Sequence, residues 1–395
     1  MSAAFPVFLI DLDSVLIEPR GYRMAIQSTL AYFTGKMGLG DLYPGEGVIA
    51  SLEAINMTCE WDITPILLTA VFEGLVRENE GLLIPADILS ACDAVRMMKL
   101  NPPTLELEKV IALLAENFKP GMEFATLALE LSQSDTVTPL FPHLAGQPVL
   151  TALLANTRLL NGALTTRVFQ HFTLGAERYE HLTGFKRLFE SESYLLKEDR
   201  VLLAEDSREA LLAAWQRNQL GVAIYTARPS MPEKGGVTSY NYSPEAEVAL
   251  EALKLTQIPL IGAGKMGWLA SQMGLRIDQL TKPSPVQALA AITTAVTRKT
   301  ESALWAAAKL NFESDKEAYR GFPTLSIHVF EDAGGNIKAV RQAAKMLEDI
   351  GVQNQVAAWG IGENPIKQQA LLNAGARLVP EINQAIQLAL DIEGL

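Results

Sequence analysis

Cysteine is almost absent from this sequence of 395 residues. Its two cysteines, Cys59 and Cys92, lie far apart and fit neither a zinc-binding nor a redox-active spacing. This argues against a scaffold held by disulfides and is typical of a reducing cytoplasm. Histidine is scarce as well, and none of the four histidines has a partner at metal-binding spacing.

The sequence also lacks long apolar runs and any cluster of positive charge. No uninterrupted apolar stretch approaches the length of a membrane span, and the N-terminus has no basic region followed by a cleavable apolar segment. The net charge is -12, which gives a nucleic-acid surface little support. We therefore expect a soluble cytoplasmic protein that binds neither nucleic acid nor a membrane.

Apolar residues are plentiful: they make up 49% of the chain, against 20% charged residues, so a sizeable core is feasible. A buried strand is expected at residues 5–10, and from Gly21 the pattern becomes helical. After Asp206 helices alternate with short apolar strands. Asp206 and Glu209 have the spacing of a capping box for a helix over residues 210–218.

Alternation of helix and strand predicts a parallel sheet with helices on both faces. We predict an α/β fold with a doubly wound parallel-sheet core, formed by residues 1–19 and 201–395. Residues 20–200 would form a large all-helical domain inserted into this core. Its middle, near residues 80–145, contains loop-like segments and is expected to be flexible.

Polar side chains that could take part in catalysis or binding follow the ends of the predicted strands. Ligands of open parallel sheets bind beyond the carboxyl ends of the strands, so these side chains should converge on one edge. Carboxylates, a hydroxyl, a guanidinium and an ammonium group stand at these positions: Asp11, Asp13, Thr226, Arg228, Lys282, Glu331 and Asp332. For Arg228, both a surface position and a contact with substrate are open.

Four segments containing these residues stand in the order of the motifs of a known family. The segments FLIDLDSVL, VAIYTAR, TKPSP and IHVFED resemble motifs I to IV of the haloacid dehalogenase superfamily, whose core is Rossmann-like. The resemblance covers about residues 5–35 and 200–380. The residues after motif I look like the phosphatase-type branch, which carries a cap domain inserted at this point. Dehalogenating branches lack the second aspartate, so Asp13 favours phosphate chemistry.

The resemblance implies a role for each motif residue. Asp11 would attack phosphorus and form an aspartyl-phosphate, while Asp13 would protonate the leaving alcohol and later activate water. Thr226 would hydrogen-bond a phosphoryl oxygen, and Lys282 would offset negative charge on Asp11 and the phosphate. Mg²⁺ would be bound by Asp11, the backbone carbonyl of Asp13 and Asp332.

The motifs depart from the family pattern in three places. Ser14 replaces the glycine that commonly follows the second aspartate. Glu331 and Asp332 stand where Gly-Asp is usual, and Asn336 replaces a second acid. An asparagine can bind a metal through its carbonyl oxygen, or hold the motif III lysine or a water, but the site loses a charge.

The expected function is a Mg²⁺-dependent phosphomonoester hydrolase that acts on a small phosphorylated metabolite. The altered motif IV favours an alternative, a non-catalytic or weakly active relative that binds a phosphorylated ligand or a protein partner. The substrate and the oligomeric state stay open. In the inserted domain, Trp61 and Asp62 would either cover the site as a lid or belong to the core of the insertion.

A glycine-rich segment provides a competing motif. Gly262, Gly264 and Gly267 spell G-x-G-x-x-G after an apolar run, as in sites for nicotinamide or flavin cofactors. The segment lies deep in the chain rather than in a first βαβ unit. Its position favours a tight turn between a strand and a helix over a dinucleotide site.

Overall fold

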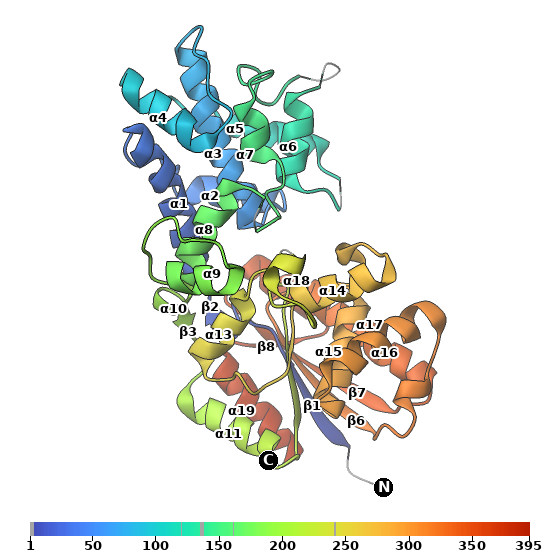
Figure 1. Ribbon diagram of the computed structural model, residues 1–395. Coiled ribbons are helices and arrows are strands. Elements are labelled where there is room, and N and C mark those ends of the chain that lie inside the picture. Colours follow the sequence, from blue (N-terminus) through green and yellow to red (C-terminus); the bar gives the residue numbers. More distant parts are fainter. Residues whose placement is uncertain (1–3, 120, 135–137, 161, 241) are drawn as a thin grey trace. The chain divides into compact units, whose positions relative to one another are not determined.

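The structure is a computed structural model of the chain (Figure 1). It describes residues 4–119, 121–134, 138–160, 162–240 and 242–395. In the described residues, no helix has both the length and the apolar character needed to cross a membrane.

The chain divides into two compact units. One consists of Met1–Pro19 and Asp199–Leu395, and the other of Arg20–Glu198. Where the chain leaves the first unit and where it returns, two short strands pair in antiparallel fashion, β2 (Ile17–Glu18) and β3 (Arg200–Val201).

A parallel sheet forms the centre of the first unit. In the described residues it has six strands, in the order β5-β4-β1-β6-β7-β8. This arrangement confirms the predicted fold class, an α/β core built on a parallel sheet with a helical insertion. The strands are β1 (Phe5–Ile10), β4 (Gly221–Tyr225), β5 (Leu260–Ile261), β6 (Leu325–Glu331), β7 (Asn354–Ile361) and β8 (Arg377–Val379).

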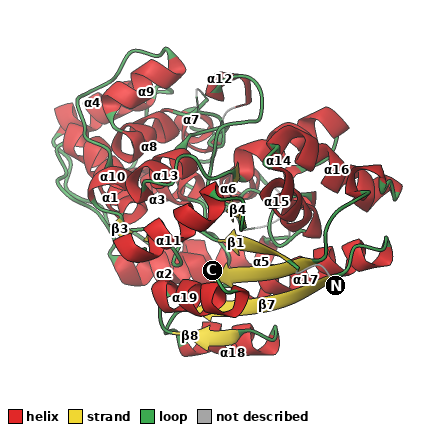
Figure 2. Cartoon of the chain, turned by 90° about the horizontal axis from the view of Figure 1, so that it is seen from below, coloured by secondary structure: helices red, strands yellow, loops and turns green. Residues whose placement is uncertain are grey.

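Helices cover both faces of this sheet (Figure 2), which is why the strand β1 is apolar at every position. Successive side chains of a strand point to opposite faces. Val7 and Leu9 pack into one core cluster, while Phe8 and Ile10 pack into the other. One face is covered by α14 (Ala263–Met273), α15 (Pro285–Thr297), α16 (Thr300–Glu313), α17 (Gly334–Asp349) and α18 (Pro365–Asn373), and the other by α11 (Glu205–Gln216), α13 (Glu245–Leu253) and α19 (Ile382–Glu393). The unit also contains α12 (Val237–Tyr240) and the 3-10 helices η1 (Ile277–Gln279) and η2 (Glu317–Tyr319).

All elements of regular secondary structure in the described residues of the second unit are helices, joined by turns and loops. Its centre is α3 (Glu60–Glu78), in which every side chain from Trp61 to Leu75 is buried. The other helices are α1 (Gly21–Met37), α2 (Glu46–Ala54), α4 (Ile88–Met98), α5 (Leu107–Asn117), α6 (Phe124–Ser132), α7 (Val149–Leu154), α8 (Leu164–Leu174), α9 (Ala176–Thr183) and α10 (Tyr194–Lys197).

One local prediction is wrong and another stays a prediction. Residues 80–145 contain the helices α4, α5 and α6, whereas residues 120 and 135–137 lie outside the described ones; the flexibility expected for this range stays a prediction. Helix α11 begins at Glu205, so Asp206 lies in its first turn and forms no capping box. The side chain of Asn383 instead accepts a hydrogen bond from the amide of Ala204 at 2.7 Å, a tertiary cap that local spacing cannot reveal.

A buried polar network joins α19 to the sheet. Trp359 donates to Nδ1 of His328 at 3.1 Å, so the ring proton is on Nε2, which donates to Glu393 at 2.8 Å. Burial lowers the pKa of His328, although Glu393 opposes the shift. Protonation of Nδ1 would turn it from an acceptor into a donor, which would then face the N–H group of Trp359.

This network predicts a pH dependence of stability. Because the pKa of His328 is lower in the folded than in the unfolded chain, the unfolded state takes up the proton more readily. The contribution of His328 to stability should be constant above about pH 6.5 and be lost as the pH drops through the folded pKa. Thermal unfolding of His328→Asn should show a shallower loss in acid, whereas the exposed control His181→Gln should keep the native slope. Equal slopes for all three proteins would contradict this assignment.

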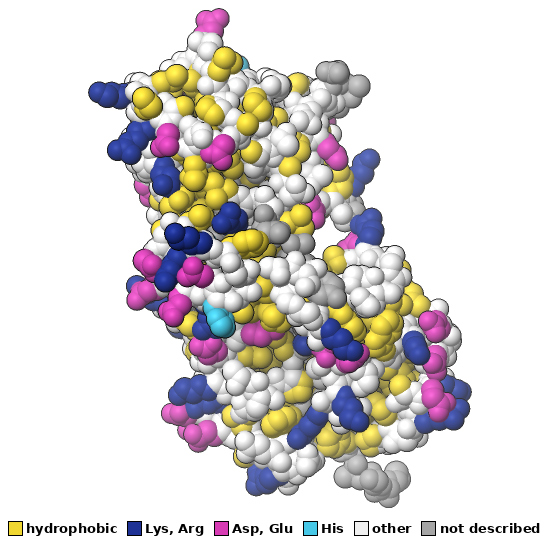
Figure 3. Space-filling model, viewed as in Figure 1, with side chains coloured by type: hydrophobic (Ala, Val, Ile, Leu, Met, Phe, Trp, Pro, Cys, Tyr) yellow, Lys and Arg dark blue, Asp and Glu magenta, His cyan; other side chains and the backbone are white. Residues whose placement is uncertain are grey.

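Acidic and basic side chains are interspersed on the face shown in Figure 3. The expectation that the chain does not bind nucleic acid stays a prediction.

Candidate active site

The carboxyl ends of three neighbouring strands place the predicted residues together. Ile10, the last residue of β1, pairs with Ile224 of β4 and Phe330 of β6, so these strands end almost level. The amide of Asp11 donates to the carbonyl oxygen of Phe330 at 3.1 Å and extends the pairing by one residue. The carboxylate of Asp11 therefore starts where the sheet stops, and its side chain is only 10% exposed.

Lys282 is the buried cation of this edge. Its Nζ lies 2.8 Å from Oδ1 of Asp11 and 2.6 Å from Oε1 of Glu331, and 3.8 Å from the centre of the Tyr225 ring. The ammonium is thus held by two carboxylates and an aromatic face, a combination that keeps it charged although its side chain is 6% exposed.

The pKa values follow from burial and from an excess of acids. Burial raises the pKa of Asp11 well above its usual range, the Glu331 carboxylate adds to the shift, and Lys282 opposes it. Burial lowers the pKa of Lys282, but the carboxylates of Asp11 and Glu331 outweigh burial and the net shift is upward. The edge is therefore short of positive charge, which a bound cation would supply.

Glu331 is the centre of a hydrogen-bond network that the sequence did not single out. Tyr225 donates its hydroxyl proton to Oε1 at 2.5 Å, and Asn336 donates to Oε2 at 3.0 Å. Together with Lys282, these donors satisfy both oxygens of a carboxylate that is fully buried. Asn336, at the position of the missing second acid, thus acts here as a donor to Glu331.

Asp332 completes a group of three carboxylates. Asp11, Glu331 and Asp332 each place a carboxylate oxygen within 4.8 Å of the others. Burial raises the pKa of Asp332, and the ammonium of Lys367 opposes this shift through an ion pair at 2.5 Å. Three clustered carboxylates are the hard oxygen donors that Mg²⁺ prefers, so the residues fit the metal expected from the sequence.

The predicted metal set differs from this group by one member. Glu331 contributes a carboxylate to the group, while Asp13 was expected to contribute its backbone carbonyl. The role of that carbonyl stays a prediction.

Thr226 and Lys282 are linked through a buried glutamine that sequence reasoning missed. Gln287 accepts a hydrogen bond from the Lys282 amide at 2.8 Å, and its own amide group donates to the carbonyls of Thr226 and Ile261 at 2.9 Å. It ties the loop before α15 to the ends of β4 and β5. A signal for it would be a long polar side chain among the mainly apolar buried residues of that helix.

Asp13 lies in a tight turn directly after β1. The carbonyl of Leu12 accepts hydrogen bonds from the amides of Val15, Leu16 and Ile17. Ser14 takes a left-handed backbone conformation with φ of 63°, which is the reason a glycine would be suited to this position. The carboxylate of Asp13 forms an ion pair with Arg228, whose side chain is completely buried.

The glycine-rich segment is explained by packing. A Cβ atom at Gly264 would lie 1.9 Å from the carbonyl oxygen of Ser230, and one at Gly267 would lie 1.6 Å from the Tyr242 hydroxyl oxygen. The amide of Gly264 donates to the Ser230 side chain at 2.9 Å. An amide that a diphosphate would need at the start of α14 is therefore bonded within the chain, which supports the tight turn over the dinucleotide site.

Two further features lie outside this edge. Asp62 is fully buried, and Arg158 pairs with it at 2.6 Å, so it belongs to the core of the insertion.

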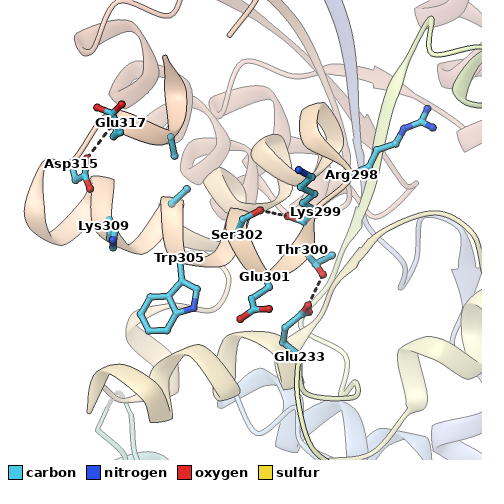
Figure 4. Close-up of a pocket in the computed structure, with 12 residues that line it drawn as sticks. Glu233, Arg298, Lys299, Thr300, Glu301, Ser302, Trp305, Lys309, Asp315 and Glu317 are labelled. Carbon is cyan, nitrogen blue, oxygen red and sulfur yellow. Dashed lines mark hydrogen bonds between the residues drawn. The ribbon is translucent and has the colours of Figure 1, made fainter. Parts of the chain in front are cut away.

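A separate hollow of about 860 Å³ is bordered by the start of α16, with Glu233, Thr300, Glu301 and Trp305 among its lining residues (Figure 4). None of the predicted site residues lines it.

Comparisons with known proteins bear on the fold. No family model matches the chain, and no curated protein matches it. An X-ray structure determined by the Northeast Structural Genomics Consortium as target ZR25 is similar over 97% of this chain and 98% of that one, with a TM-score of 0.61 and 14% identity. The phosphatase Tt82 from Thermococcus thioreducens aligns over 93% of this chain and 99% of its own, with a TM-score of 0.44 and 14% identity. At these identities the similarity to the first structure shows a shared fold alone, and the second supports no inference.

Proposed function

We propose that the chain is a Mg²⁺-dependent phosphomonoester hydrolase of the haloacid dehalogenase type that acts on a small phosphorylated metabolite. The observation that carries the proposal is the environment of Asp11. This carboxylate stands at the end of the central strand, touches the buried ammonium of Lys282 and belongs to a group of three clustered acids. A nucleophile, a cation and a metal-binding group thereby share one edge.

The proposed reaction uses Asp11 and Asp13 in turn. The Asp11 carboxylate attacks phosphorus, the bond to the leaving oxygen breaks, and Asp13 gives that oxygen its proton. A water molecule then attacks the aspartyl-phosphate, and Asp13 takes the proton of this water. Asp11 and phosphate are released, and the proton that Asp13 takes from water replaces the one that it gave to the leaving oxygen.

Thr226 and Lys282 would bind the phosphoryl group. The Thr226 hydroxyl accepts a hydrogen bond from the Arg228 amide at 3.0 Å, and a hydroxyl that accepts one bond can still donate its own proton to a phosphoryl oxygen. Lys282 would offset the charge that gathers between Asp11 and the phosphate. Asp11, Asp332 and the Asp13 carbonyl would hold Mg²⁺, which would neutralise the phosphoryl oxygens.

A panel of phosphate esters with and without metal tests this proposal. Purified protein with Mg²⁺ should release phosphate from p-nitrophenyl phosphate and from some metabolite esters. A chelator should abolish the release, and added Mg²⁺ should restore it. Equal turnover with metal and with chelator would contradict the metal dependence, and a lack of turnover on every ester would contradict the hydrolase.

One observation favours the alternative of a non-catalytic binding protein. Lys367 pairs with Asp332, Asn336 donates to Glu331 and Lys282 pairs with Asp11, so all three clustered acids already have partners other than the proposed metal. A protein without turnover that phosphate or a phosphate ester stabilises against thermal unfolding would favour this alternative.

A further inference from the structure

The side chain of Arg228 lies between two carboxylates: that of Asp13, the proposed acid/base, and that of Asp199. Its Nε and Nη2 atoms donate to the two oxygens of Asp13, Nε at 3.3 Å. Nη1 and Nη2 donate to Oδ2 of Asp199 at 3.4 and 3.3 Å. The side chains of Arg228 and Asp199 are 0% exposed, whereas that of Asp13 is 34% exposed. The guanidinium group is therefore withdrawn from solvent, and it contacts the partly exposed carboxylate of Asp13.

Arg228 is itself held in place. Its amide donates to the Thr226 hydroxyl at 3.0 Å, and its carbonyl accepts from the Ala263 amide at the start of α14. Asp199 adds a second anchor at the point where the chain returns from the insertion, next to β3. A planar guanidinium fixed at its base and at its tip can hold a carboxylate in one plane and one direction.

The turn around Asp13 needs such a support. The amides bonded to the Leu12 carbonyl fix the backbone, but they leave the torsions of the Asp13 side chain undetermined. A general acid must point at the leaving oxygen within hydrogen-bond distance. The two hydrogen bonds from Arg228 settle this direction.

We propose that Arg228 is a positioning residue that aims the Asp13 carboxyl group at the leaving oxygen, and that Asp199 anchors Arg228. The proposal rests on the proposed phosphatase function. A carboxyl group offers about four lone-pair sites, and Arg228 uses one on each oxygen of Asp13. The exposed side of Asp13 keeps the capacity to carry the proton that the leaving oxygen receives as its bond to phosphorus breaks.

The dependence of rate on the leaving group separates this role from a structural one. p-Nitrophenolate leaves without a proton, whereas the alkoxide of benzyl phosphate must receive one. The double variant Arg228→Gln with Asp199→Asn avoids an unpaired buried charge and so favours folding. Its kcat/KM should fall at least about tenfold for benzyl phosphate, which is part of the roughly hundredfold or more that a general acid contributes, and about threefold at most for p-nitrophenyl phosphate.

Two further variants sharpen the result. In Asp13→Asn the acid is already missing, so adding the double change should widen the difference between the two esters no further. Arg158→Gln removes another arginine from a buried carboxylate, in the insertion, and should lower thermal stability while leaving the ratio of the two esters unchanged.

The outcomes distinguish the two levels of the account. Equal losses for the two esters would overturn the positioning role and leave the phosphatase standing. A wild-type protein that hydrolyses neither ester with Mg²⁺ would overturn the phosphatase, and the positioning role with it.

Discussion

Replacing Asp11 by asparagine should abolish phosphate release. The amide has nearly the same size and can still accept the hydrogen bond that the Leu12 amide gives to Oδ1 at 2.8 Å, but it cannot act as the nucleophile. Residues that form the covalent intermediate carry most of the rate enhancement, so we expect kcat to fall at least about a thousandfold. The measurement is release of p-nitrophenolate with Mg²⁺ at saturating substrate.

Asp278→Asn is the matched control, because this aspartate is exposed and its ion pair with Arg276 is local. The control should retain native activity, and circular dichroism should show both variants folded. An Asp11→Asn protein that keeps more than about a tenth of the native rate would exclude Asp11 as the nucleophile.

The second large effect concerns stability. Lys282→Met leaves the buried carboxylates of Asp11 and Glu331 without their ammonium group. Removing one partner of a buried pair typically costs roughly 3–5 kcal/mol, because the remaining charge is left uncompensated. The free energy of unfolding, measured with urea, should fall by about this amount.

Lys367→Met is the control for this variant. Lys367 pairs with Asp332, but its side chain is 52% exposed, so its loss should change stability by about 1 kcal/mol or less. Adding Glu331→Gln to Lys282→Met should recover part of the lost stability, since one of the unpaired charges is removed as well. Equal destabilisation by the two lysine variants would show that burial does not set the strength of the Lys282 contacts.

The fold could be predicted because its strands are buried on both faces. Phe5–Ile10 is an uninterrupted apolar run followed by Asp11, and Leu325–Glu331 is mainly apolar and ends in an acid. The helices between the strands follow the period of an α-helix. The start of α11 could not be predicted, because its N-terminal contact comes from Asn383 on another helix.

The candidate site could be predicted as far as strand ends determine it. Asp11, Lys282, Glu331 and Asp332 come together because parallel strands share one carboxyl edge. Which acid is hydrogen-bonded by which donor depends on distant contacts: Glu331 receives the Tyr225 hydroxyl across 106 residues of sequence. No local pattern encodes that contact.

The same limit applies to Arg228 and to the glycine-rich segment. From the sequence, both a surface position and a contact with substrate were open for Arg228. In the structure its side chain is buried between Asp13 and Asp199. The glycines of the G-x-G-x-x-G pattern avoid Ser230 and Tyr242, neighbours that only the tertiary structure brings near.

Trapping the covalent intermediate tests the central claim most directly. Asp13→Asn should slow hydrolysis of the aspartyl-phosphate, so the intermediate should accumulate during turnover of p-nitrophenyl phosphate. Acid quenching and reduction with borohydride convert an aspartyl-phosphate to homoserine, which mass spectrometry of the peptides locates. The account predicts homoserine at position 11, and only in samples that received both ester and Mg²⁺. Phosphate release from the ester with aspartate unmodified at position 11, or with homoserine at another position, would contradict it.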